Sequence, residues 1–192
     1  MEIYLIRHTA VHNPEKRCYG QSDIDLSPKW VEHFDDLKQK LGVVSPEAKF
    51  YSSPYKRCTQ LAGFLSDNQF ETDHRLAEMN FGDWEQSPWT AIDQSVLNSW
   101  MTDYVNFKVP GGESFTIMHN RCAEFWLGLI SKDVPHVVVI THAGVIRSLL
   151  ANIIKMPLDK VFQIDIDYSS ITKITVTEYK SSLNQQVNFI NR

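Results

Sequence analysis

The stretch Ile3-Tyr4-Leu5-Ile6-Arg7-His8-Thr9 begins as an apolar run and ends in a cation and an imidazole. A buried strand of a parallel sheet typically reads as roughly 4 to 8 apolar residues. We therefore expect a strand over residues 2–6, with Arg7 and His8 at the point where it leaves the sheet. Ligands of open parallel sheets bind just outside the carboxyl ends of the strands. The Arg7-His8 pair is therefore a candidate site for an anionic ligand.

Two later segments repeat this pattern. Residues 50–57 read as a short strand that runs into a Ser-Pro helix start, with Arg57 in the first helical turn. Residues 136–144 read as a more apolar strand that ends at His142, before another helix. If the three strands lie side by side, Arg57 and His142 converge with the Arg7-His8 pair on one pocket. Cations at a helix N-terminus suit a phosphate group.

The bulk composition is that of an ordinary globular protein. The 192 residues are 43% hydrophobic and 22% charged, with a net charge of −4, and we expect one domain over residues 1–192. This charge favours neither nucleic acid nor an anionic membrane as a partner. Cys18, Cys58 and Cys122 have no metal-ligand spacing, which favours free thiols in a reducing compartment. Without a membrane-length apolar run or a signal-peptide pattern, we expect a cytoplasmic protein. The sequence carries no signal for an oligomeric state.

Helical and strand patterns alternate along the chain. Expected helices cover residues 28–41, 54–66, 113–131 and 143–155, and expected inner strands cover residues 2–6, 48–52, 70–76 and 136–141. In the tail, Phe162, Ile164 and Ile166 alternate, as do later apolar positions, which predicts edge strands joined by polar turns such as Lys180-Ser181-Ser182. We therefore expect an α/β fold, a three-layer α/β/α sandwich with a mostly parallel central sheet and antiparallel edge strands.

Residues 79–112 differ from the rest of the sequence in pattern, because they are rich in aromatic residues that follow no regular period. We expect an irregular segment over the pocket, in which most aromatic residues pack against one another. Trp84 or its aromatic neighbours should line the pocket mouth and favour a bulky, flat substrate group. In the helix that follows, an apolar stripe should be buried, with His119 and Arg121 at the surface.

Five segments in this order carry a family resemblance. They are Leu5-Ile6-Arg7-His8-Thr9, Ser52-Ser53-Pro54-Tyr55-Lys56-Arg57, Leu76-Ala77-Glu78-Met79-Asn80-Phe81-Gly82-Asp83-Trp84-Glu85, Pro110-Gly111-Gly112-Glu113-Ser114 and Val139-Ile140-Thr141-His142-Ala143-Gly144-Val145-Ile146-Arg147. Together they resemble the histidine phosphatase superfamily, also called phosphoglycerate mutase-like, and most of all its α-ribazole phosphatase branch. The resemblance runs from about residue 1 to about residue 150. Thr9 stands where the family usually has glycine.

Phosphoryl transfer needs a nucleophile, charge stabilisation on the phosphoryl oxygens and a proton for the leaving group. A neutral imidazole attacks without first losing a proton, which makes His8 the natural nucleophile. The resemblance implies the same roles: His8 becomes phosphohistidine, Glu78 is the acid, and Arg7, Arg57 and His142 form the phosphate pocket. It also implies substrate contacts at Asn13 and at Gly20-Gln21-Ser22.

These residues predict a metal-independent phosphatase that hydrolyses a small phosphate monoester, with α-ribazole 5′-phosphate in cobalamin synthesis as a candidate substrate. No cofactor is expected, since the chain has no HExxH motif and no carboxylate cluster that would demand a metal. The alternatives are phosphoglycerate mutase-type phosphoryl transfer and a non-catalytic phospholigand-binding protein. A metal-dependent hydrolase is disfavoured because the seven histidines are scattered.

Overall fold

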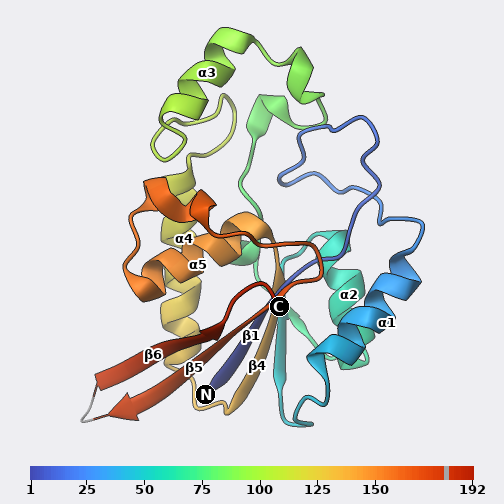
Figure 1. The fold of residues 1–192 in the computed structure, drawn as a ribbon, viewed down its shortest axis with the longest axis vertical. Coiled ribbons are helices and arrows are strands. Elements are labelled where there is room, and N and C mark those ends of the chain that lie inside the picture. The colour runs from blue at the N-terminus through green and yellow to red at the C-terminus, as the bar shows by residue number, and fades with distance from the viewer. Residues whose placement is uncertain (180–181) are drawn as a thin grey trace.

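The computed structural model describes residues 1–179 and 182–192. The described residues form a six-stranded sheet in the order β3-β2-β4-β1-β5-β6 (Figure 1). The strands are β1 (Glu2–Arg7), β2 (Lys49–Ser52), β3 (Glu71–Thr72), β4 (His136–Thr141), β5 (Ile171–Tyr179) and β6 (Ser182–Phe189). The first four run parallel, whereas β5 is antiparallel to β1 and β6 is antiparallel to β5. The expected α/β fold with a mostly parallel sheet and antiparallel edge strands is confirmed.

Helices cover both faces of this sheet. The α-helices are α1 (Trp30–Leu41), α2 (Lys56–Ser66), α3 (Gln94–Thr102), α4 (Phe115–Ile130) and α5 (Ala143–Ile154). Short 3-10 helices are η1 (His74–Leu76), η2 (Gly82–Trp84), η3 (Trp89–Ala91) and η4 (Leu158–Gln163). Helices α1 and α2 lie on one side of the strands, and α4 and α5 lie on the other (Figure 1). Among the described residues, no helix is both long and apolar enough to cross a membrane.

The central strand β4 explains the layering. Val137 and Val139 are fully buried in the cluster that contains the α4 and α5 side chains. Val138 and Ile140, which alternate with them, are fully buried in the cluster that contains the α1 and α2 side chains. Successive strand residues point to opposite faces, so an unbroken apolar run is what a strand covered on both sides requires. Each such side chain stabilises the fold by about 1.5–3 kcal/mol relative to exposure.

The tail departs from the sequence-based expectation at its beginning. The alternation of Phe162, Ile164 and Ile166 does not form a strand, because residues 158–163 are the 3-10 helix η4. The apolar residues that face the core there are Leu158, Val161 and Ile164, which recur every three residues. Three residues per turn is the period of a 3-10 helix. The expected strand, which rested on a period of two residues, was therefore wrong.

Further along the tail, β5 and β6 confirm the antiparallel edge strands. Lys180 and Ser181 of the expected polar turn lie outside the described residues. Several earlier elements are shorter than expected: β3 holds Glu71 and Thr72 alone, and α1, α2 and α4 each begin two residues later than expected.

Helix α4 buries the expected stripe of Met118, Cys122, Phe125, Trp126 and Leu129. The expectation that His119 and Arg121 are surface residues is wrong, because both are half-buried. Nδ1 of His119 lies 3.0 Å from Oγ of Ser148 on α5, and Arg121 turns toward the backbone of residues 75–78. Neighbours pack on both flanks of this helix, so its buried arc is wider than one apolar stripe.

The aromatic-rich segment lies at the end of the molecule opposite the N-terminus, with α3 as its outermost helix (Figure 1). The local sequence explains α3, because Asp93 caps its N-terminus. Oδ1 of Asp93 accepts hydrogen bonds from the backbone N–H groups of Ser95, at 2.9 Å, and Val96, at 3.1 Å. Such a side-chain cap satisfies amide groups that the first helical turn leaves unpaired.

Candidate active site

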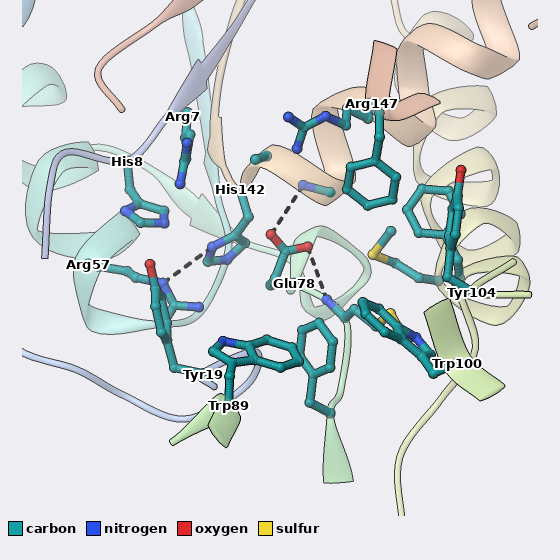
Figure 2. Close-up of a pocket in the computed structure, with 17 residues that line it drawn as sticks. Arg7, His8, Tyr19, Arg57, Glu78, Trp89, Trp100, Tyr104, His142 and Arg147 are labelled. Carbon is teal, nitrogen blue, oxygen red and sulfur yellow. Dashed lines mark hydrogen bonds between the residues drawn. The ribbon is translucent and has the colours of Figure 1, made fainter. Parts of the chain in front are cut away.

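Three neighbouring strands end at one place. Their register sets Arg7 opposite Thr141 and Ser52 opposite Ile140. The backbone N–H of His8 then donates to the Thr141 carbonyl at 3.0 Å, one residue beyond the strand. The sheet therefore brings together the ends of β1, β2 and β4, as the sequence predicts. Figure 2 shows the side chains that gather there.

His8 is 2% exposed and is held in one tautomer. Its Nδ1 lies 2.8 Å from the carbonyl oxygen of Thr9, which can only accept, so Nδ1 carries the proton. The lone pair of Nε2 is then free. Burial lowers the pKa of His8 well below its ordinary value, and the cations Arg57 and Arg7 lower it further. His8 is therefore a neutral imidazole with one unprotonated nitrogen.

His142 is neutral for the same reasons but makes different bonds. Nε of Arg57 donates to His142 Nδ1 at 3.3 Å, so the Nε2–H of His142 donates to Ser53 Oγ at 2.7 Å. Burial lowers the pKa of His142 well below its ordinary value, and Arg57 and His8 add to the effect. The ring centroids of His8 and His142 are 5.2 Å apart. A phosphate dianion beside the two rings would raise both pKa values again.

Arg57 is fully buried in the first turn of α2 and is fixed by backbone carbonyls. Its Nη2 donates to Gly20 O at 2.6 Å and its Nη1 donates to Ser22 O at 2.8 Å. Arg7 is held differently, with Nη1 donating to Ile166 O at 2.7 Å. The Nε of Arg7 is buried without a hydrogen-bond partner among the described residues. Both guanidinium groups line the same cavity.

Glu78 faces these cations from an irregular segment. Its Oε2 accepts from the backbone N–H of Gly144 at 3.1 Å, and its Oε1 accepts from that of Met79 at 3.1 Å. The first amide belongs to the N-terminus of α5, where the first N–H groups are left free for a side-chain acceptor. Gly144 allows this approach, since a Cβ there would lie 2.3 Å from Glu78 Oε1. In Figure 2, Glu78 lies between the histidine cluster and the aromatic side of the cavity.

The loop Gly20-Gln21-Ser22 supports Arg57 through its carbonyls, and its side chains are not among those that line the cavity. Glu85 holds this loop by accepting from the Gln21 N–H at 2.7 Å and from the Ser22 hydroxyl. Asn13 is also outside the cavity lining. Its side chain closes a local turn through two bonds of 2.9 Å to the backbone of Arg17.

The cavity has a volume of about 260 Å³ and two unlike ends. One end holds the cations, the two histidines and Glu78. The other is lined by apolar and aromatic side chains, namely Met79, Phe81, Trp89, Trp100, Tyr104, Phe115, Met118 and Phe162. Such a mixture of apolar walls and a few polar groups is typical of a small-molecule site.

Trp84 itself is not among the residues that line this cavity. It is 6% exposed and lies behind the wall, with ring centroids 5.9 Å from Trp100 and 6.5 Å from Trp89. Its aromatic neighbours line the cavity in its place. The density of aromatic residues therefore locates the wall, but the choice of which ring faces inward depends on tertiary packing.

Sequence reasoning gave no role to Arg147 or Tyr19, which both line the cavity. Arg147 lies one helical turn beyond Gly144, and this spacing on a helix that begins at the pocket was the available signal. Its Nε donates to Ile164 O at 2.8 Å. Burial lowers the pKa of Arg147, and among the described residues no carboxylate forms an ion pair with it.

Within residues 1–179 and 182–192, no three or more His, Cys, Asp or Glu side chains are grouped as ligands for a metal ion. The three cysteines are free and buried, and burial raises the pKa of Cys58, the thiol beside His142, to about 12.

Comparison with known proteins gives consistent results. The family model "Histidine phosphatase superfamily (branch 1)" matches residues 3–188. "Putative phosphoserine phosphatase 2" of Hydrogenobacter thermophilus is 27% identical over 193 residues, which covers 94% of this chain and 92% of that protein. The adenosylcobalamin/alpha-ribazole phosphatase of Escherichia coli is 25% identical over 190 residues, which covers 95% of this chain and 94% of that protein.

The fold is also similar to that of solved structures. The alpha-ribazole phosphatase of Shigella flexneri superposes with a TM-score of 0.85 at 24% identity, over 100% of this chain and 96% of that chain. The family match spans almost the whole chain, and the relatives named here are phosphatases. The chain therefore belongs to branch 1 of the histidine phosphatase superfamily.

Proposed function

We propose that this protein is a phosphatase that hydrolyses a small phosphate monoester through a phosphohistidine at His8. The observation that carries the proposal is the tautomer of His8. Because Nδ1 donates to the Thr9 carbonyl, the lone pair of Nε2 is free to attack phosphorus. Arg7 and Arg57 line the same cavity and offset the charge of a phosphate dianion.

The reaction has two steps in this proposal. Nε2 of His8 forms a bond to phosphorus as the bond to the leaving oxygen breaks, and Glu78 gives that oxygen a proton. In the second step a water molecule attacks the phosphohistidine and loses a proton to Glu78. Inorganic phosphate leaves, and His8 returns to the neutral form. The two guanidinium groups provide the charge stabilisation throughout, so the proposal includes no metal ion or other cofactor.

The aromatic end of the cavity suggests a flat, apolar leaving group, since Trp89 and Trp100 stack nearly parallel with centroids 6.0 Å apart. α-Ribazole 5′-phosphate, an intermediate in cobalamin synthesis, carries such a group and is our first candidate. The name of the Escherichia coli relative supports this choice. A cytoplasmic location, expected from the sequence, fits this role.

A second substrate class follows from Arg147. Arg147 is half-buried, and a guanidinium in a cavity wall with no ion-pair partner among the described residues is suited to a second anionic group on the substrate. Phosphorylated carboxylic acids, such as phosphoserine or 3-phosphoglycerate, carry one. The name of the Hydrogenobacter relative supports this class. With 3-phosphoglycerate, mutase-type transfer is the alternative outcome to hydrolysis.

A turnover screen tests the proposal. Release of phosphate would be measured with α-ribazole 5′-phosphate, phosphoserine, 3-phosphoglycerate and a hexose phosphate, with and without EDTA. We expect hydrolysis of at least one substrate at a rate that EDTA leaves unchanged. Binding without turnover of any ester would favour a phospholigand-binding protein, and inhibition by EDTA would favour a metal-dependent hydrolase. A transfer product rather than free phosphate would favour the mutase.

Arg147→Gln separates the two substrate classes. This substitution should reduce kcat/KM for phosphoserine about tenfold or more and change that for α-ribazole 5′-phosphate little, because only the former carries a carboxylate. An equal loss on both substrates would assign Arg147 to the phosphate itself or to the fold.

A further inference from the structure

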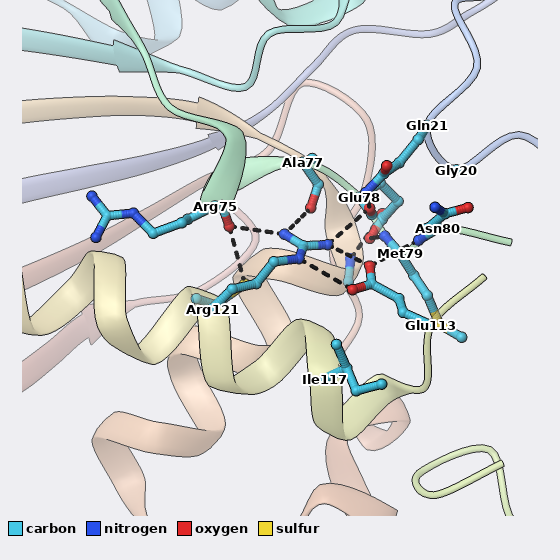
Figure 3. Close-up of polar contacts among 12 residues, drawn as sticks. Gly20, Gln21, Arg75, Ala77, Glu78, Met79, Asn80, Glu113, Ile117 and Arg121 are labelled. Carbon is cyan, nitrogen blue, oxygen red and sulfur yellow. Dashed lines mark hydrogen bonds and ion pairs between the residues drawn. The ribbon is translucent and has the colours of Figure 1, made fainter. Parts of the chain in front are cut away.

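Arg121 extends from α4 to the underside of the segment that carries Glu78 (Figure 3). Its side chain is 18% exposed, and that of its ion-pair partner Glu113 is 11% exposed. Neither residue lines the cavity. The pair lies behind the segment that carries the proposed acid, outside the cavity lining.

The guanidinium of Arg121 uses all of its hydrogen-bond donors within the protein. Nη1 donates to the carbonyls of Arg75, at 2.9 Å, and Ala77, at 2.6 Å. Nη2 donates to the Glu78 carbonyl at 3.0 Å and to Glu113 Oε1 at 2.6 Å, and Nε donates to Glu113 Oε2 at 3.3 Å. An arginine side chain has five N–H groups, and these bonds account for each of them. No donor is left over for a ligand.

The backbone that Arg121 holds lies in an irregular segment, where the Glu78 carbonyl also accepts from Gln21 Nε2 at 3.0 Å and the Arg75 carbonyl from Cys122 Sγ at 3.6 Å. Residues 74–76 form a single turn of 3-10 helix, and Ala77 and Glu78 belong to no helix or strand. Buried carbonyl groups outside regular structure still need partners, and the guanidinium supplies them. Without Arg121, the Glu78 carbonyl would still accept from Gln21, whereas the Ala77 carbonyl would lose its side-chain donor.

Glu113 fixes the backbone that follows Glu78 in the chain. Its Oε1 accepts from the Asn80 N–H at 2.8 Å, and its own N–H donates to the Asn80 carbonyl at 2.9 Å. The Arg121–Glu113 pair therefore joins the residues on both sides of Glu78 to the start of α4. The Glu78 carboxylate in turn reaches the start of α5 through the N–H of Gly144.

We propose that Arg121 is a positioning residue for Glu78: it fixes the backbone of residues 75–78 so that the carboxyl group reaches the leaving-group oxygen. This inference rests on the proposed role of Glu78 as the acid. A misplacement of about 1 Å can cost a catalytic group on the order of a hundredfold in rate. The loss should appear only where proton donation matters, because His8, Arg7 and Arg57 belong to other elements.

The test compares leaving groups in the phosphorylation step, by single turnover, with Arg121→Lys. Lysine keeps the charge beside Glu113 but lacks the planar fork that reaches three carbonyls. We expect a loss of about 10- to 100-fold on an alkyl phosphate and less than about threefold on p-nitrophenyl phosphate, whose leaving group needs little proton assistance. Arg75→Gln is the matched control, since its side chain is paired with Asp73 and only its carbonyl meets Arg121. That control should leave both rates unchanged.

An equal loss on both substrates, or no loss on either, would overturn the inference and assign Arg121 to the fold alone. Should Arg121→Lys not fold, Glu113→Gln provides the second test. Glutamine keeps the shape of the Glu113 side chain but weakens its hydrogen bonds with Nη2 and Nε of Arg121. Glu113→Gln should cause a smaller loss of rate than Arg121→Lys, again larger on the alkyl phosphate than on p-nitrophenyl phosphate. An equal loss on both substrates would again overturn the inference. Glu78→Gln is run in parallel. If the loss in Glu78→Gln does not depend on the leaving group, the acid role of Glu78 itself fails. If the loss depends on the leaving group in Glu78→Gln but not in the Arg121 and Glu113 variants, only the positioning role is rejected.

Discussion

His8 and His142 are both buried, neutral imidazoles, yet their hydrogen bonds suit them to different tasks. The protein occupies one nitrogen of His8 and both nitrogens of His142. His8 therefore has a free lone pair, whereas His142 holds Arg57 and is itself held by Ser53. A nucleophile must have a free nitrogen, so we assign the attack to His8.

At the same scale, Glu78→Gln should reveal whether Glu78 donates a proton. Glutamine keeps the size and hydrogen-bonding ability of the side chain but has no transferable proton. General acid catalysis is worth roughly 100- to 10,000-fold, and most of that factor should be lost on an alkyl phosphate and much less on p-nitrophenyl phosphate. The rate of the phosphorylation step, measured by single turnover, is the appropriate quantity.

If both substrates lose the same factor, Glu78 positions a neighbouring group rather than donating a proton. Glu85, the next carboxylate in the same segment, would be a poor alternative acid, because its carboxylate already accepts hydrogen bonds from Gln21, Ser22 and Phe81.

Single residues show where sequence reasoning reaches its limit. Arg7, His8, Arg57 and His142 could be located because strand ends and helix starts can be recognised from local pattern. Trp84 could not be told from Trp89, because packing between distant segments decides which ring lines the cavity and which lies behind it. The same holds for Arg121, whose partners besides Glu113 are backbone carbonyls that no side-chain pattern reveals.

At the scale of elements, the start of α5 contributes two parts of the site. His142 is the N-cap residue of this helix, and the N–H of Gly144 in its first turn holds the Glu78 carboxylate. The short helix η4 then places Phe162 against Arg147, with 5.1 Å between the guanidinium carbon and the ring centroid. Strands and long helices were predictable from their periods, but η4 was not, because three residues per turn and alternation are hard to distinguish over six residues.

Gly144→Ala tests the junction between α5 and Glu78. The new Cβ would lie 2.3 Å from Glu78 Oε1, so the carboxylate must move away from the helix start. We expect kcat on an alkyl phosphate to fall about tenfold or more, with the free energy of unfolding changed by less than about 1 kcal/mol. Both quantities would be measured on the same preparation, by steady-state kinetics and by denaturant unfolding.

Gly128→Ala is the control for that substitution. Gly128 also lies within a helix, α4, but a Cβ there would meet nothing within 4 Å. It should raise the free energy of unfolding by about 0.5–1 kcal/mol and leave kcat unchanged. If Gly144→Ala behaves like this control, the close approach of Glu78 to α5 has no part in the reaction.

At the scale of the whole molecule, the cavity is formed where the carboxyl ends of the parallel strands meet the segment of residues 79–112. The strand ends and the helix starts that follow them supply the cations and histidines, and that segment supplies most of the aromatic wall. A mostly parallel sheet covered on both faces, with antiparallel edge strands, follows from sequence patterns. The path of the aromatic segment does not, because few of its residues belong to regular elements. The single-domain organisation stays a prediction.

The two buried histidines also predict how stability depends on pH. Their pKa values are lowered in the folded protein, so the unfolded chain binds protons more readily. Their contribution to stability is therefore full above the ordinary histidine pKa of about 6.5 and is lost as pH falls below it. Each can lower the free energy of unfolding by up to about 1.4 kcal/mol per pH unit, measured by urea unfolding between pH 7.5 and 5.

His142→Gln should make that dependence shallower, whereas His12→Gln, at an exposed histidine, should leave it unchanged. A free energy of unfolding that stays level from pH 7.5 to 5 would mean that neither histidine is held neutral by the fold.

The central claim is that His8 carries the phosphoryl group, and trapping the intermediate tests it most directly. The protein would be mixed with a substrate labelled in its phosphoryl group, quenched in base and assayed for bound label by mass spectrometry of peptides. A phosphohistidine is stable in base and labile in acid. We predict acid-labile label on His8 in the unaltered protein and in His12→Gln, and none in His8→Ala. Label that persists in His8→Ala, or that survives acid, would contradict the account.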